Sequence, residues 1–169
     1  MAAPVLELKA GARTAYIVAT SVAEGDLAIS SSQPGLEARR RKVVDLPWTW
    51  MHQVHGATVV RVTQAGEGAG VDADAAVTAT PAAVLAVQVA DCAPVALVGS
   101  DGIVGIAHVG WRGLVAGTIR ATVDAMGSRE LRGALYEAHL LPLFSFLGGS
   151  TLSRSGYARA RAAAPTADS

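Results

Sequence analysis

Three short segments carry the residues of this chain that could do chemistry, and a turn residue lies in or beside each. His55 ends the segment MHQVH, Cys92 lies in ADCAP, and His108 lies in AHVGWRG. One thiolate and two imidazoles directed at a single point would make a three-ligand metal site. Such a site keeps an open fourth position, which is typical of a catalytic zinc rather than a structural one. The functional interpretation therefore depends on whether the three segments meet.

Two of these residues are brought together by a predicted hairpin. The sequence Ser-Asp-Gly at 100–102 predicts a tight turn between strands at 95–98 and 103–108. Because the two strands are then antiparallel, Cys92 and His108 fall at the same end of the hairpin. This turn does not place His55, which lies in a separate segment. The spacing of the three residues also matches no known metal-binding repeat.

Each candidate residue also has a purely structural interpretation. A lone cysteine in an apolar stretch often serves as a small buried hydrophobe, and isolated histidines often serve packing. The glycine-rich turn at 110–113 could bind an anion through helix-start N–H groups and the guanidinium of Arg112, or it is an ordinary strand-to-helix turn. Asp72 and Asp74 could support a metal or orient a ligand as a carboxylate pair, or they cap a turn after the preceding glycine-rich loop.

The composition fits one domain rather than several. The 169 residues are 51% hydrophobic and only 5% aromatic, which favours a sheet of small and β-branched side chains with helices packed on it. The 14 basic and 14 acidic residues balance, so no net field favours nucleic acid or an anionic membrane. A single cysteine excludes an internal disulfide, and no signal peptide or membrane-length apolar run is present. We therefore expect a cytoplasmic protein.

The elements that must position the candidate residues are predicted from hydrophobic periodicity and turn residues. Loops are expected at 24–35 and 64–70, and residues from 150 onward are expected to be poorly ordered. The basic residues 39–42 are interpreted as the solvent-facing side of a helix rather than as an anion-binding patch. Strands are predicted over residues 15–21, 58–63, 75–78, 85–89, 95–98 and 103–108, and helices over 36–46 and 114–126.

Four motifs, taken in order, resemble the YfiH/laccase-domain family, which is also called the DUF152 or polyphenol oxidase family. They are HQVHG at 52–56, DADA at 72–75, ADCAPV at 90–95 and AHVGWRG at 107–113, within a matching core of about residues 48–127. The resemblance implies an α/β fold of stacked mixed β-sheets flanked by helices. It also implies a metal held by His55, Cys92 and His108, whereas His52 falls at a variable position and is not counted as a ligand.

The resemblance further implies a zinc-dependent enzyme acting on purine nucleosides and phosphate. Family members are described as phosphorolysing adenosine, inosine, guanosine and methylthioadenosine and as deaminating adenosine. Arg112 is the candidate for binding phosphate. The family's older description is a copper-dependent polyphenol oxidase of the laccase type. The four histidines of this chain are too few for a conventional multicopper oxidase, although one copper ion could occupy the three-ligand site.

Two further interpretations stay open, and the departure of the chain from the family pattern at both ends motivates the second. We expect a metal-site domain over 1–127 and a divergent C-terminal segment over 128–169. One alternative is a cysteine hydrolase or deamidase in which Cys92 is the nucleophile and His108 the base. Another is an inactive, truncated family member. The sequence makes no prediction of the oligomeric state.

Overall fold

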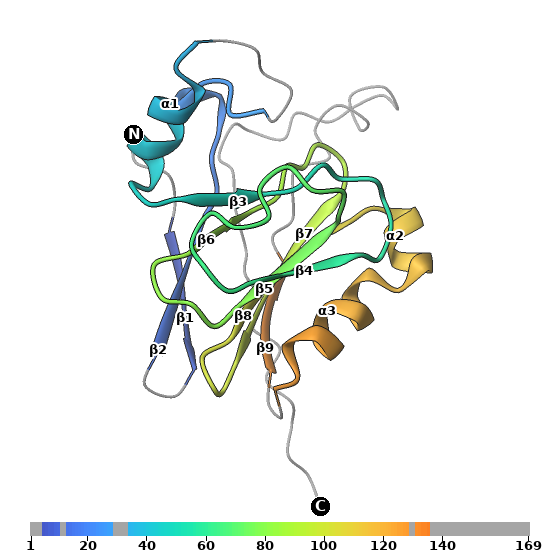
Figure 1. Ribbon diagram of the computed structural model, residues 1–169. Coiled ribbons are helices and arrows are strands. Elements are labelled where there is room, and N and C mark those ends of the chain that lie inside the picture. The colour runs from blue at the N-terminus through green and yellow to red at the C-terminus, as the bar shows by residue number, and fades with distance from the viewer. Residues whose placement is uncertain (1–4, 11–12, 29–33, 129–130, 136–169) are drawn as a thin grey trace, which may run out of the picture.

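A five-stranded sheet forms the centre of the protein in the computed structural model, which describes residues 5–10, 13–28, 34–128 and 131–135 (Figure 1). β4 and β5 are parallel, and each of the other neighbouring pairs is antiparallel. This mixed arrangement confirms the predicted α/β fold class. The strand order is β4 (Val59–Val62), β5 (Ala75–Thr78), β8 (Val104–Val109), β7 (Ala93–Gly99) and β9 (Leu131–Leu135).

The central strand β5 is buried on both faces of this sheet, which explains its run of small and β-branched residues. Val77 packs on one face with Met126 of helix α3 (Thr118–Met126). Ala76 packs on the other face with Met51 and Leu85, which belong to a second layer. The large sheet is therefore enclosed between α3 and this second layer, and that enclosure fixes the strand ends that carry the candidate residues.

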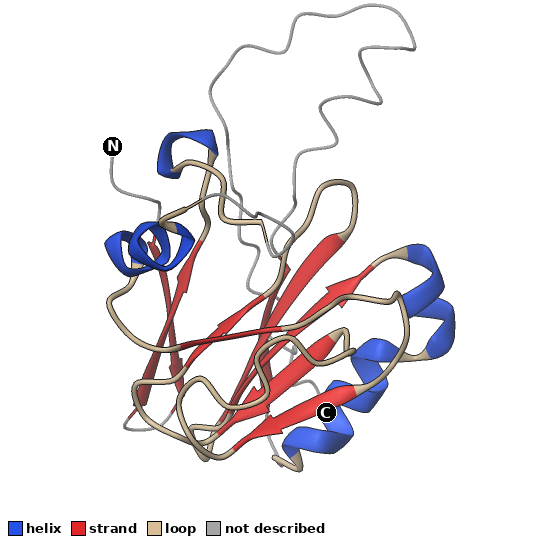
Figure 2. Ribbon diagram, turned by 45° about the horizontal axis from the view of Figure 1, so that its top comes forward, coloured by secondary structure: helices blue, strands red, loops and turns tan. Residues whose placement is uncertain are grey.

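The second layer contains two small sheets. Strand β3 (Trp48–Trp50) pairs in parallel with β6 (Val84–Ala86), and β1 (Val5–Ala10) pairs with β2 (Arg13–Val18) as an antiparallel ribbon. A single 3-10 turn follows at Val22–Glu24. Helix α1 (Leu36–Val43) and the helix pair α2–α3 lie on opposite sides of the molecule (Figures 1 and 2). Among the described residues, no helix is both long enough and apolar enough to cross a membrane.

The hairpin predicted at 100–102 is present. The Gly102 N–H donates to the Gly99 carbonyl at 2.8 Å, and Gly102 adopts the left-handed conformation with φ 82°. The register pairs Pro94 of β7 with His108 of β8. Since Cys92 directly precedes β7, it lies at the same end of the hairpin as His108, as the turn predicts.

The helix predicted over 114–126 is instead two helices, α2 (Trp111–Ala116) and α3. The break falls at Gly117, whose φ of 87° ends one helix and begins the next. Glycine reaches this conformation without a Cβ clash, so the hydrophobic periodicity continues through a point where the backbone changes direction. The other predicted helix, 36–46, ends earlier, at Val43, and Val44 is extended.

Arg41 and Lys42 in the basic cluster of α1 are exposed, but Arg40 departs from the predicted solvent-facing side. Arg40 is only 5% exposed, and its guanidinium lies 5.2 Å from the ring centre of Trp50 and 5.9 Å from that of Trp48. The aromatic rings of two β3 residues thus cover the planar guanidinium of Arg40. A guanidinium group tolerates such burial better than an ammonium group, because it is more weakly hydrated. Burial lowers the pKa of Arg40 below its ordinary value. The segment from 136 onward, including the predicted poorly ordered end, lies outside the described residues.

Candidate metal centre

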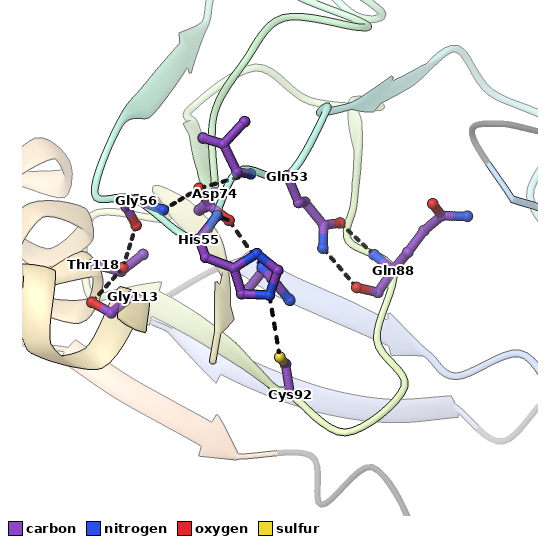
Figure 3. Close-up of polar contacts among 10 residues, drawn as sticks. Gln53, His55, Gly56, Asp74, Gln88, Cys92, Gly113 and Thr118 are labelled. Atoms are coloured by element: carbon purple, nitrogen blue, oxygen red, sulfur yellow. Dashed lines mark hydrogen bonds and ion pairs between the residues drawn. The ribbon is translucent and has the colours of Figure 1, made fainter. Parts of the chain in front are cut away.

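The structure brings together one atom each from His55, Cys92 and His108. These three ligand atoms all lie within 4.8 Å of one another. The Cys92 Sγ is 3.8 Å from the His55 Nε2 (Figure 3). The two imidazole rings meet edge to face, with centroids 4.8 Å apart. The residue that the hairpin alone did not place, His55, therefore joins the other two.

Each of the three side chains comes from a different element. His108 lies near the end of β8 and is buried, Cys92 directly precedes β7 and is half-buried, and His55 lies in the exposed connection between β3 and β4. The group is consequently anchored in the core on one side and open to solvent on the other. This gradient suits a site that a small molecule must reach.

The backbone at His55 is held in an uncommon conformation by a buried carboxylate. His55 has φ 59°, in the left-handed region that a residue with a Cβ seldom adopts. The N–H groups of Val54, His55 and Gly56 all donate to the Asp74 carboxylate, at 3.2, 2.9 and 2.7 Å. Three successive N–H groups around one anion form a compact nest, which compensates for the strained residue.

The same carboxylate of Asp74 also fixes the ring of His108. The His108 Nδ1 lies 2.9 Å from the Asp74 Oδ1, and both side chains are buried. Because Nδ1 is engaged there, Nε2 is the nitrogen left for a metal, which is the usual carboxylate–histidine arrangement behind a metal ligand. Burial alone would raise the Asp74 pKa, but hydrogen bonds from the His108 ring and the three backbone N–H groups outweigh it, so the pKa is lowered.

Asp72 and Asp74 do not act as a carboxylate pair. Asp72 is exposed and its carboxylate lies 2.7 Å from the Nδ1 of His52 at the surface, whereas Asp74 is completely buried. The two aspartates thus serve different histidines. The sequence analysis named Asp74 as a candidate but paired it with Asp72, and its contacts with His108 and the His55 segment could not be predicted because these partners lie far away in the chain.

A side chain at position 110 would displace two of the candidate ligands. A Cβ on Gly110 would lie 2.8 Å from the Cys92 Sγ and 2.9 Å from the His55 Cδ2, closer than such atoms approach. Gly110 is extended rather than left-handed, so the restriction comes from space and not from the backbone. The close approach of the thiol and the imidazole is therefore built on the absence of a side chain at the strand-to-helix junction.

Arg112 lies in the first turn of α2 with an exposed side chain. Its guanidinium lies 5.3 Å from the ring centre of Trp111. The neighbouring Thr118 anchors this region, since its Oγ1 lies 2.6 Å from the Gly56 carbonyl and 2.7 Å from the Gly113 carbonyl. The helix start is thus tied to the His55 segment, while phosphate binding by Arg112 stays a prediction.

The donor set fits a tetrahedral zinc ion. Zinc bonds of about 2.0–2.3 Å place neighbouring nitrogen and sulfur ligand atoms roughly 3.3–3.6 Å apart. The Cys92 Sγ and the His55 Nε2, at 3.8 Å, are near this separation, and all three ligand atoms, within 4.8 Å of one another, need to move only slightly inward to bind one ion. Burial, with added repulsion from the carboxylates of Asp91 and Asp74, raises the pKa of the Cys92 thiol. A metal cation is the partner that would stabilise the thiolate in this setting.

Comparison with known proteins gives the same assignment along most of the described chain. A family model described as multi-copper polyphenol oxidoreductase laccase matches residues 27–140. The purine nucleoside phosphorylase YfiH of Escherichia coli is 47% identical over 77 residues, which are 44% of this chain and 31% of that protein. A purine nucleoside phosphorylase of Pseudomonas aeruginosa is 42% identical over 80 residues, which are 47% of this chain and 32% of that protein. The chain thus spans about a third of the length of these curated relatives.

Solved structures agree with the sequence comparisons. The crystal structure of a Neisseria meningitidis protein of the DUF152 group superposes with a TM-score of 0.63 at 30% identity, covering 78% of this chain and 61% of that one. YlmD from Geobacillus stearothermophilus gives a TM-score of 0.55 at 26% identity, covering 64% and 49%. With its four motifs gathered around one His-Cys-His group, the chain belongs to the multi-copper polyphenol oxidoreductase laccase family, the family of the YfiH proteins.

Proposed function

We propose that this protein is a zinc-dependent purine nucleoside phosphorylase whose metal is held by His55, Cys92 and His108. The observation that carries the proposal is the convergence of the three ligand atoms within 4.8 Å. The reaction class is supported by relatives that are named purine nucleoside phosphorylases. The proposed substrates are adenosine, inosine, guanosine and methylthioadenosine, together with phosphate, and adenosine deamination is a proposed second activity.

A bound zinc ion would supply Lewis acidity and one open coordination position. The chain's own residues do the rest. Asp74 holds the Nδ1 proton of His108 and thereby keeps Nε2 as the donor atom. His55 stands on the exposed side, where a nucleoside can approach. Arg112 offers a forked, permanently charged donor on the neighbouring helix, which suits a phosphate oxygen pair.

Two alternatives use the same residues differently. A donor set of two imidazoles and one thiolate also accepts copper, which agrees with the laccase description of the family. A nucleophilic Cys92 would need a lowered thiol pKa, whereas burial and the nearby carboxylates raise it. This direction favours the metal-ligand role of Cys92 over the cysteine hydrolase or deamidase.

The reaction is tested by product analysis with the full chain loaded with zinc. Adenosine is incubated with and without inorganic phosphate, and the bases and nucleosides are separated. We expect free adenine only when phosphate is present, and inosine in both conditions if deamination also occurs. Absence of any purine product from the zinc-loaded protein would contradict the proposed function and favour the inactive family member.

A further inference from the structure

One side chain joins the segment that carries His55 to the segment that carries Cys92. The Nε2 of Gln53 donates to the Gln88 carbonyl at 2.7 Å, and the Gln88 N–H donates to the Gln53 Oε1, also at 2.7 Å (Figure 3). Both hydrogen-bonding groups of the Gln53 amide are thus used on the backbone N–H and C=O of a single residue 35 positions away. The pair imitates one rung of a β-ladder where the described chain has no strand.

This link falls where the Cys92 segment is otherwise least supported. In the described chain, the stretch between Ala86, the end of β6, and Ala93, the start of β7, belongs to no helix or strand. Gln88 lies within that stretch, four residues before Cys92. Gln53 lies two residues before His55, in the connection that follows β3. The amide therefore spans the gap between two ligand-bearing loops.

We propose that Gln53 is a positioning residue for the Cys92 thiolate at the metal centre. Asp74 already ties the His55 segment to the ring of His108, and Gln53 ties the same segment to the Cys92 loop. Hydrogen bonds from the His55 segment thus lead to both other ligands, through Asp74 to His108 and through Gln88 to the segment that carries Cys92. The inference rests on the proposed metal centre and goes beyond it, because it assigns the placement of the sulfur ligand to a residue that binds no metal.

The physical consequence is selective loss of the sulfur ligand. Metal ligands must be held within a few tenths of an ångström. A loop that becomes ordered only when the metal binds loses conformational entropy, and this loss weakens metal affinity. Without the amide link, the Cys92 segment is held only at its β7 end, while both histidines keep their hydrogen bonds to Asp74. Changes in outer-shell partners of metal ligands typically weaken binding by about 10- to 100-fold.

The test is a cobalt(II) titration of the metal-free full chain, because the sulfur-to-cobalt charge-transfer band reports the thiolate directly. Gln53→Met keeps the length of the side chain and removes both hydrogen bonds. The matched control is Gln88→Ala, which leaves the backbone groups used by Gln53 and removes only the side-chain bond to the Leu27 carbonyl. We expect wild type and Gln88→Ala to develop the full band, and Gln53→Met to bind about tenfold or more weakly with a diminished band.

A wild-type band and affinity in Gln53→Met would overturn the inference, as would an equal loss in Gln88→Ala. If Gln53→Met does not fold, Gln53→Glu is measured instead, since its carboxylate can still accept the Gln88 N–H but cannot donate to the Gln88 carbonyl. The same weakening is expected there, and wild-type behaviour would again overturn it. Nucleosides play no part in this titration, so its outcome is separate from the success or failure of the proposed reaction.

Discussion

Asp74 connects more of the metal centre than any ligand does. One carboxylate accepts hydrogen bonds from three successive backbone N–H groups around His55 and from the His108 ring. It is completely buried, so each of these bonds is protected from competing water. A charged acceptor is needed because four donors converge on it. Asp74 therefore contributes both to the stability of the fold and to the geometry of two ligands.

The substitution Asp74→Asn tests this double role. An amide replaces one acceptor oxygen by a donor facing N–H groups, so we expect a loss of about 2 kcal/mol in the free energy of unfolding of the metal-free protein. Zinc affinity should fall by about 10- to 100-fold. Denaturant titration and a competitive zinc chelator measure the two effects. Asp72→Asn is the control, with less than about 0.5 kcal/mol expected at that exposed site. Equal effects of the two substitutions would contradict the role of Asp74.

The raised pKa of Cys92 makes a prediction about its reactivity. In the metal-free protein the thiol stays protonated at neutral pH, because burial and the carboxylates of Asp91 and Asp74 oppose the thiolate. Alkylation by iodoacetamide should be slow at pH 7 and should rise with pH only above the range of a free cysteine, about 8.5. Zinc should protect the thiol. Rapid alkylation of the metal-free protein at neutral pH would instead support the cysteine hydrolase or deamidase.

At the scale of elements, the site depends on the junction between β8 and α2. Gly110 lies at this junction and leaves just enough space for Cys92 and His55 to approach each other. The restriction is steric, since the backbone there is ordinary for any residue. A side chain at this position would push apart two of the three ligands without unfolding the strand or the helix.

Gly110→Ala should therefore reduce zinc affinity by at least about tenfold. Its control is Gly127→Ala at the end of α3, where φ is 64° and no atom lies within 4 Å of the added Cβ. That control should lose about 1 kcal/mol of stability through backbone strain and keep its zinc affinity. Isothermal titration with zinc and thermal unfolding separate the two results. Unchanged zinc affinity in Gly110→Ala would show that the close approach at position 110 is not required.

The elements that could be predicted are those whose causes are local. The hairpin at Gly102 follows from three adjacent residues, and β5 follows from a short apolar run. The break at Gly117 was missed because the apolar periodicity continues across it, and the burial of Arg40 was missed because the aromatic rings that cover it belong to another element. The β1–β2 ribbon also escaped complete prediction, since only β2 overlaps a predicted strand.

The site divides in the same way. Cys92 and His108 could be paired from the hairpin, whereas His55 entered through the family resemblance and reaches them by long-range hydrogen bonds to Asp74. The proposed contribution of Gln53 could not be predicted, because Gln53 bonds to the backbone N–H and C=O of Gln88. Any residue type at position 88 except proline would offer the same two groups. Residues that act through the backbone of a distant segment leave little trace in a single sequence.

The chain as a whole carries all three candidate metal ligands although it matches only part of the length of its relatives. It spans about a third of the curated relatives it matches, yet all four motifs lie within the described residues. The five-stranded sheet that carries His108, and that Cys92 directly precedes, also includes β9, which lies within the residues matched by the family model. The proposed metal binding and the proposed nucleoside turnover can therefore be tested separately, and the three residues proposed to hold the metal all lie within the described part of the chain.

Metal content is consequently the measurement that most directly tests the three-ligand centre. The full chain and Cys92→Ala are purified without added metal, dialysed against zinc, and measured for bound zinc per protein by elemental analysis, with circular dichroism to show that both are folded. We expect one zinc per wild-type chain and a loss of most bound zinc in Cys92→Ala. A folded wild-type protein that binds no zinc, or a Cys92→Ala variant that binds it as well as wild type, would contradict the three-ligand centre.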